Sequence, residues 1–80
     1  MYPNPFSETI TITYQIEKSE KTEIIIYDVL GHIVEILLDE KMTTGIHQVE
    51  WDGRKYASGS YYCVMTTSGS TDVRKMTLVK

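Results

Sequence analysis

The chain has 80 residues and a formal net charge of −3, so it holds one small domain with little chain left for a deep catalytic pocket. Its eight Lys and Arg are outnumbered by eleven Asp and Glu, which excludes the concentrated basic surface that nucleic-acid binding requires. Nine Ile, six Val and ten Thr stand against one Ala and four Leu, and this composition favours strands over helices.

The sequence contains few features that indicate a cellular compartment. No window has the length and hydropathy of a membrane-spanning helix, and the start, Met1 to Pro5, has neither the basic nor the apolar region of an export signal. We therefore expect no direct membrane insertion. Cys63 is the single cysteine, so an internal disulfide is excluded and the redox compartment stays open.

Three strands are predicted in the first half of the chain. Glu8 to Ile16 alternates between apolar and polar residues, as a half-buried strand does. Thr22 to Tyr27 contains three successive Ile, so both of its faces are apolar and it is expected to be a central strand. After a turn that ends at Gly31, Ile33 to Leu38 is predicted to pair with the second strand as a hairpin.

Three more strands follow a polar stretch from Asp39 to Thr44. Ile46 to Trp51 alternates again, and Asp52-Gly53 then signals a turn. The short connection after that turn, 54–58, has room for a single helical turn. The remaining strands are expected at Gly59 to Thr67 and at Thr71 to Val79, with a hairpin loop between them.

This count gives six or seven short antiparallel strands and no long helix. Because one apolar face of a single sheet would remain in water, we expect two sheets packed face to face as a β-sandwich. A small closed barrel is the second possibility. The whole chain, residues 1–80, is predicted to be one domain.

Candidate catalytic and metal-binding residues are sparse. Cys63 is predicted in the middle of a strand as a buried thiol, and His32 and His47 lack the spacing of a chelating pair. Asp39, Glu40 and Asp52 could supply oxygens to Ca²⁺, but without the spacing of a dedicated loop. We therefore predict no enzyme activity, no metal site and no cofactor.

Aromatic residues offer one further binding possibility. Trp51, Tyr61 and Tyr62 are the only aromatic concentration and could stack on sugar rings if they were exposed. Trp51 lies in phase with Val49, however, so core packing is the preferred interpretation.

Several short motifs occur in one order along the chain: Tyr2-Pro3-Asn4-Pro5-Phe6, Ile12-Thr13-Tyr14, Ile26 to Gly31, Gly45 to Gly53, Ser58 to Tyr62 and the ending Lys75 to Lys80. Together they resemble the type A C-terminal sorting domain of the type IX (Por) secretion system of Bacteroidetes. The resemblance covers Tyr2 to Lys80. It implies an immunoglobulin-like β-sandwich that acts as a secretion signal. Ser60 and His32 depart locally from the family pattern.

The resemblance also implies partners and a location. A larger cargo would precede the domain in the parent protein, and the type IX translocon and a sortase-like surface peptidase would act on it. The parent would pass through the periplasm to the cell surface or the medium. Met1 is then expected to mark a cut from a larger chain.

The resemblance implies motif and sorting positions at Tyr2, Pro3, Asn4, Pro5, Gly31, Gly45, Trp51, Gly59, Tyr61, Lys75 and Lys80. The final strand is the expected recognition element. Two other functions remain as alternatives at this point: an immunoglobulin-like domain of a flagellar hook-capping protein, and a carbohydrate-binding module.

Overall fold

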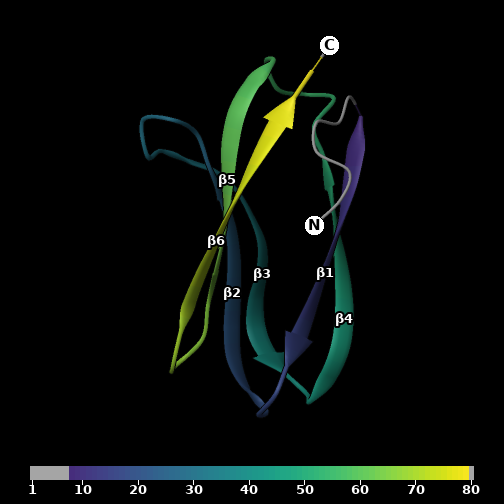
Figure 1. Ribbon diagram of the computed structural model, residues 1–80, viewed down its shortest axis with the longest axis vertical. Coiled ribbons are helices and arrows are strands. Elements are labelled where there is room, and N and C mark those ends of the chain that lie inside the picture. The colour runs from purple at the N-terminus through teal and green to yellow at the C-terminus, as the bar shows by residue number, and fades with distance from the viewer. Residues whose placement is uncertain (1–7, 80) are drawn as a thin grey trace.

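A computed structural model describes residues 8–79. Within that range the chain forms six strands and no helix, arranged in two layers (Figure 1). The strands are β1 (Thr9–Ile16), β2 (Glu20–Tyr27), β3 (Ile33–Met42), β4 (Gly45–Asp52), β5 (Gly59–Thr66) and β6 (Thr71–Leu78). The described residues contain no helix long and apolar enough to cross a bilayer.

Strand pairing divides the molecule into two sheets. β1 and β4 form a two-stranded sheet, and the other four strands form a sheet in the order β3-β2-β5-β6. All neighbouring strands are antiparallel. The chain crosses between the sheets after β1, β3 and β4, so the fold is the expected sandwich and the closed barrel is not formed.

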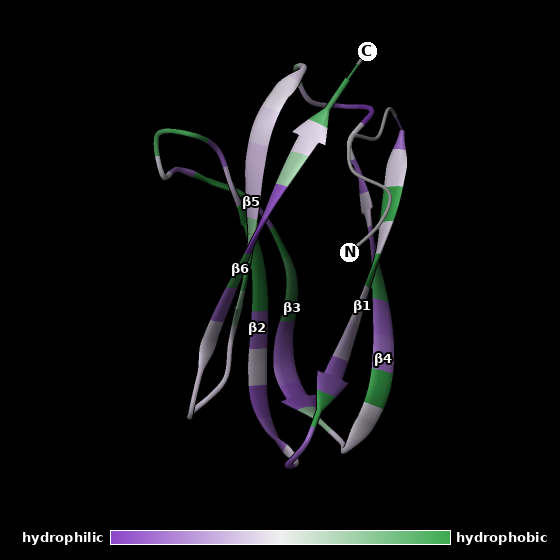
Figure 2. Ribbon diagram, in the orientation of Figure 1, coloured by the Kyte–Doolittle hydropathy of each residue, from purple (hydrophilic) through white to green (hydrophobic). Residues whose placement is uncertain are grey.

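The two-stranded sheet follows directly from the alternation in its sequence. Side chains of successive strand residues point to opposite faces, so the Thr residues of β1 face solvent while its Ile residues are buried. Ile10 lies opposite Trp51, and Ile12 lies opposite Val49. Figure 2 shows the resulting alternation of hydrophobic and hydrophilic bands along β1 and β4.

β2 is an inner strand of the four-stranded sheet, as its three successive Ile residues predict. It pairs with β3 on one side and with β5 on the other. Ile24 and Ile26 are 1% and 0% exposed and point into the core, while Ile25 is half-buried on the outer face. Two irregularities in the β2–β3 register increase the local twist of this hairpin.

Some predicted boundaries were wrong. β3 continues to Met42 instead of ending at Leu38, because Asp39 pairs with Glu23 and Glu40 with Thr22 along a sheet edge where charged side chains reach water. β2 likewise begins at Glu20. The connection 54–58 holds a turn, with the Tyr56 N–H donating to the Gly53 carbonyl at 3.1 Å, and no helical turn.

The core lies between the two sheets. The buried apolar residues come from five strands: Ile10, Ile12, Tyr14, Ile16, Ile24, Ile26, Trp51, Tyr61, Cys63, Met76 and Leu78. The half-buried face predicted for β1 and the core positions predicted for Trp51 and Cys63 are therefore confirmed. Thr22 is buried beside them, and its hydroxyl donates a hydrogen bond to the Glu20 carbonyl at 3.3 Å.

Candidate functional site

The turn glycines among the predicted positions lie where the backbone requires them. Gly31 has a φ of 84° in the β2–β3 turn, and Gly45 has a φ of 132° at the start of β4. Residues other than glycine rarely adopt such φ angles. Asp28 completes the first turn, because its carboxylate accepts hydrogen bonds from the N–H groups of Leu30 and His32, both at 2.9 Å. These bonds lower the pKa of Asp28.

Trp51 and Tyr61 belong to one aromatic cluster at the end of the sandwich where β4 leads into β5. Trp51 is 0% exposed, and its ring lies 5.2 Å from that of Tyr61 and 5.5 Å from that of Tyr56. The Tyr61 hydroxyl donates to the carbonyl of Ala57 at 2.6 Å, as in the tyrosine corner of immunoglobulin-like domains. Gly59 lies between Ala57 and Tyr61 in the sequence and is the first residue of β5.

This burial decides the interpretation of the aromatic residues. Stacking on a sugar requires an exposed ring face, and the side chain of Trp51 is fully enclosed while Tyr61 is 8% exposed. Tyr62 points to the opposite face of β5 and is half-buried. Trp51 and Tyr61 therefore act as core residues, as the preferred interpretation predicts.

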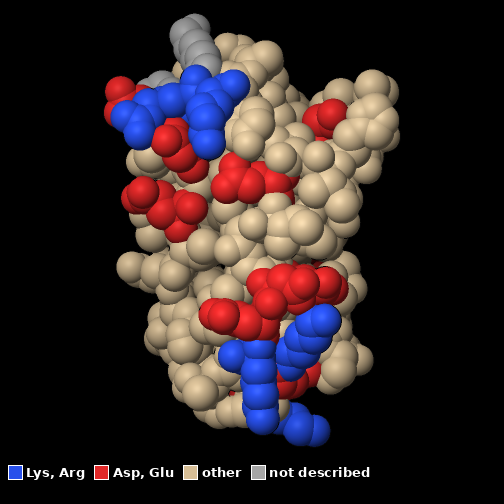
Figure 3. All heavy atoms as spheres, turned by 180° about the vertical axis from the view of Figure 1, so that it is seen from behind, with Lys and Arg blue, Asp and Glu red and all other residues tan. Residues whose placement is uncertain are grey.

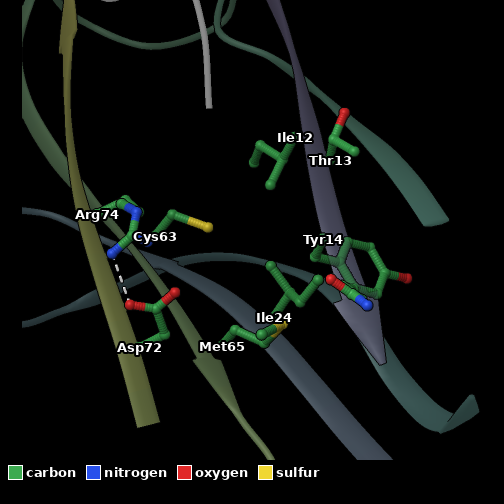
Figure 4. A pocket seen from close by; sticks show the side chains of 9 residues that line it. Ile12, Thr13, Tyr14, Ile24, Cys63, Met65, Asp72 and Arg74 are labelled. Atoms are coloured by element: carbon green, nitrogen blue, oxygen red, sulfur yellow. Dashed lines mark hydrogen bonds and ion pairs between the residues drawn. The ribbon is translucent and has the colours of Figure 1, made fainter. Parts of the chain in front are cut away.

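A groove of about 290 Å³ opens between the two sheets on the side where β1 faces β6 (Figure 4). Apolar side chains from both layers line it, among them Ile12, Ile24 and Met65. Asp72 and Arg74 of β6 also line it, joined by an ion pair of 2.6 Å. Within residues 8–79 both strands are edges of their sheets, so this groove lies on an open side of the described sandwich.

The hydrogen-bond pattern of the β5–β6 hairpin fixes which backbone groups of β6 face its free edge. The Thr67 N–H donates to the Ser70 carbonyl at 2.9 Å, so this pair is directly bonded. In an antiparallel ladder bonded and non-bonded pairs alternate, so Asp72 and Arg74 are bonded to β5. The N–H and C=O groups of Thr71 and Val73 consequently point away from β5.

The turn before β6 is tied to the start of β2. The Glu20 carboxylate accepts a hydrogen bond from the Ser68 N–H at 2.9 Å and another from the Ser68 hydroxyl. These two bonds lower the pKa of Glu20. They hold the β5–β6 turn in place and so position the beginning of β6.

The charged side chains do not form a basic patch on the face drawn in Figure 3, where Lys and Arg gather at the two ends, each group beside acidic side chains. Arg54 pairs with Asp52 at 2.9 Å, and Lys21 pairs with Asp39 at 3.4 Å. The hydrogen bonds from Arg54 lower the pKa of Asp52 to about 2. Lys75 is an exposed residue of β6.

The structure also places the residues that were considered for catalysis. Cys63 is 4% exposed, and burial raises the pKa of its thiol to about 11, so it is a core residue. His32 lies in the exposed β2–β3 turn, 3.5 Å from Asp28. The ring of His47 stacks on Tyr14 at 5.6 Å, and its Nε2 donates to the Thr43 carbonyl at 2.7 Å.

No cluster that could hold a metal ion occurs within residues 8–79. The carboxylates considered for calcium are separated, since Asp39 and Glu40 lie near the end of β3 and Asp52 ends β4. Tyr2, Pro3, Asn4, Pro5 and Lys80 lie outside the described residues.

The comparison with known protein families decides what kind of domain this is. All of the chain, residues 1–80, matches the family described as the secretion system C-terminal sorting domain. The chain belongs to this family. No curated protein and no solved structure matches the sorting domain significantly. The resemblance found in the short motifs is thereby confirmed, and the chain is a C-terminal sorting signal for type IX secretion.

The free edge of β6 was only partly foreseen. The sequence predicts the final strand as the recognition element, with Lys75 in it, but it does not predict the ion pair of Asp72 with Arg74. The one available signal was the spacing of Asp72 and Arg74, which places opposite charges on the same face of a strand. Their position beside an open groove depends on strand order, which a short motif does not encode.

Proposed function

We propose that this sorting domain directs a covalently linked N-terminal cargo across the outer membrane, and that the translocon reads it through the edge of β6. Family membership supports the role as a secretion signal. The observation that supports β6 as the recognition element is its position at an edge that no other strand of residues 8–79 pairs with, with Thr71 and Val73 presenting backbone groups outward. Such an edge binds an extended segment by strand addition.

Seven of the eleven motif positions divide into two groups in this proposal. Gly31, Gly45, Gly59, Trp51 and Tyr61 support the turns and the core of the signal. Lys75 and Lys80 belong to the segment that contacts the secretion machinery. A sortase-like peptidase then cuts upstream of the domain, and the cargo reaches the cell surface or the medium after passing through the periplasm.

The proposal is tested with a reporter that carries a signal peptide and ends in residues 1–80, expressed in a host with a type IX system. Val73→Pro removes an outward-facing N–H and leaves the β5–β6 ladder intact, because Val73 is not bonded to β5. We expect this reporter to stay in the periplasm. Deletion of Val73 to Lys80 is expected to do the same.

Thr11→Pro is the matched control. The Gly53 N–H donates to the Glu8 carbonyl at 2.7 Å, so Glu8 and Gly53 are a bonded pair. Bonded and non-bonded pairs alternate along β1 and β4, so the N–H of Thr11 points away from β4, towards the edge of the two-stranded sheet. The Thr11 variant is expected to reach the surface like the parent. Normal export of a folded Val73→Pro reporter would refute the role of the β6 edge, and failure of the unmodified signal to export the reporter would refute the function itself.

A further inference from the structure

The side chains of β6 make its outer edge, which no other strand of residues 8–79 covers, self-complementary. Asp72 and Arg74 flank Val73 on the inner face of the strand, next to the groove. If a second β6 lies antiparallel beside the first with Val73 opposite Val73, each Asp72 faces Arg74 of the other copy. The backbone groups of Asp72 and Arg74 are bonded to β5, so these two residues would form a non-hydrogen-bonded pair across the new interface. Side chains of such pairs lie closest together in an antiparallel sheet, and this short separation favours an ion pair.

The backbone agrees with this register. Val73 directs its N–H and C=O away from β5, and the carbonyl accepts only a long hydrogen bond of 3.4 Å from Arg74 Nη1. Two Val73 residues placed opposite each other can exchange both backbone hydrogen bonds once Arg74 turns to the Asp72 of the other copy. If the register shifted by one residue, backbone groups that point to the edge would lie opposite groups that are bonded to β5. Side chains of the second copy would also move to the opposite face of the sheet. The next in-phase registers place Asp72 opposite Asp72 or Arg74 opposite Arg74, and like charges directly opposite are destabilising.

The outer face of the four-stranded sheet carries an apolar row that this pairing would extend. Ile36 lies opposite Ile25, Ile25 opposite Val64, and Val64 opposite Val73, so an apolar row crosses all four strands. The row ends at the free edge with Val73, which is 51% exposed. A second copy centred on Val73 extends this row without interruption and covers part of its exposed end.

We propose that β6 pairs with β6 of a second copy of this chain, antiparallel and centred on Val73, to join two four-stranded sheets into one. Asp72 and Arg74 of both copies then form an alternating group of four charges, and the intramolecular ion pair of 2.6 Å becomes part of it. This inference rests on the geometry and charge of β6 and does not depend on the sorting role.

The test measures the oligomeric state of the purified chain by analytical ultracentrifugation from micromolar to millimolar concentration. The unmodified chain is expected to form a dimer that weakens as salt is added, because its exposed charges are screened. Asp72→Lys places a positive charge opposite Arg74, and Arg74→Asp places a negative charge opposite Asp72. Each variant alone should dimerise about tenfold more weakly or worse.

Mixing the two variants supplies the decisive control. In a mixed pair the positive charge introduced at position 72 of one chain faces the negative charge introduced at position 74 of the other. The unchanged Arg74 of the first chain faces the unchanged Asp72 of the second, so attraction returns at both positions and a heterodimer should form. A variant that failed only because it was unfolded could not be rescued in this way.

Three results would overturn the proposal. The first is an unmodified chain that stays monomeric at millimolar concentration. The second is dimerisation that both charge reversals leave unchanged. The third is a mixture of the two variants that stays monomeric.

Discussion

Tyr61 connects the start of β5 to the loop before it through a single hydroxyl group. Its O–H donates to the carbonyl of Ala57 at 2.6 Å, and its ring packs against Trp51 at 5.2 Å. A hydrogen bond of this kind contributes about 1 kcal/mol net, because folding exchanges it for bonds to water. The packing of the ring contributes separately through the apolar area that it buries.

The corresponding prediction separates these two contributions. Tyr61→Phe keeps the ring and removes the hydroxyl, so we expect the free energy of unfolding to fall by about 1 kcal/mol. Tyr62→Phe, on the outer face of the same strand, should change it by less than about 0.5 kcal/mol. Urea unfolding of both variants provides the measurement. Equal effects would show that the bond to Ala57 has no particular weight.

Ile26 and Ile46 test burial with the same chemical change. Ile26 is 0% exposed in the centre of the four-stranded sheet, whereas Ile46 is 73% exposed on β4. Removing one methylene group from a packed core costs about 0.5–1.5 kcal/mol for Ile→Val. We expect this loss for Ile26→Val and almost none for Ile46→Val in the same unfolding measurement. A reversed order would contradict the assignment of the inner face of β2.

At the scale of the elements, the local patterns predicted much more than the arrangement of the strands. Alternation in β1 and three successive Ile in β2 predicted a half-buried strand and an inner strand, and both predictions are confirmed. Partner choice could not be predicted in the same way. β1 pairs with β4, 29 or more positions away along its whole register, because the sheets form through contacts distant in sequence.

The end of β3 shows a second limit of local patterns. A polar run from Asp39 is typical of a loop, yet Asp39 to Met42 continue the strand. An edge strand tolerates charged residues because its outer side meets water, and whether a strand lies at an edge follows from the topology. The same reason explains why the groove beside β6 could not be derived from the motifs.

The turn between β2 and β3 gives a prediction for a whole connection. Gly31 has a φ of 84°, and no atom would lie within 4 Å of an added Cβ, so an alanine would be limited by backbone strain alone. Placing a residue with a Cβ in this region costs about 1–2 kcal/mol. Gly31→Ala should therefore lower stability by that amount.

Gly69→Ala is the matched control, since Gly69 also has open space for a Cβ and no left-handed φ. It should leave stability unchanged or raise it slightly, because alanine restricts the unfolded chain. Thermal unfolding of both variants distinguishes them. If Gly31→Ala melted at the temperature of the parent, the turn would not require a positive φ.

The whole molecule should lose stability in acid through its surface carboxylates. The pKa of Asp52 falls from its ordinary value of 3.8 to about 2 in the folded state, because Arg54 donates hydrogen bonds to it. A lowered folded pKa means that the stabilising contribution is fully present above pH 3.8 and is lost as the pH falls towards 2. Glu20 and Asp28 act in the same direction.

Asp52→Asn tests this dependence. The variant should unfold more easily than the parent at neutral pH, and the difference should shrink as the pH falls from 3.8 towards 2. Glu17→Gln serves as the control, because Glu17 is an exposed carboxylate in the turn between β1 and β2. A difference between Asp52→Asn and the parent that stayed constant across this range would contradict the assignment.

The domain is a folded sorting signal, and its central feature is the groove between β1 and β6 in the described residues. Photo-crosslinking in cells that export the reporter tests this most directly, with a light-activated residue at position 73 or at position 11. We expect the residue at position 73 to capture a component of the outer-membrane translocon and the residue at position 11 to capture none. Capture from position 11 alone, or from neither position during active export, would contradict it.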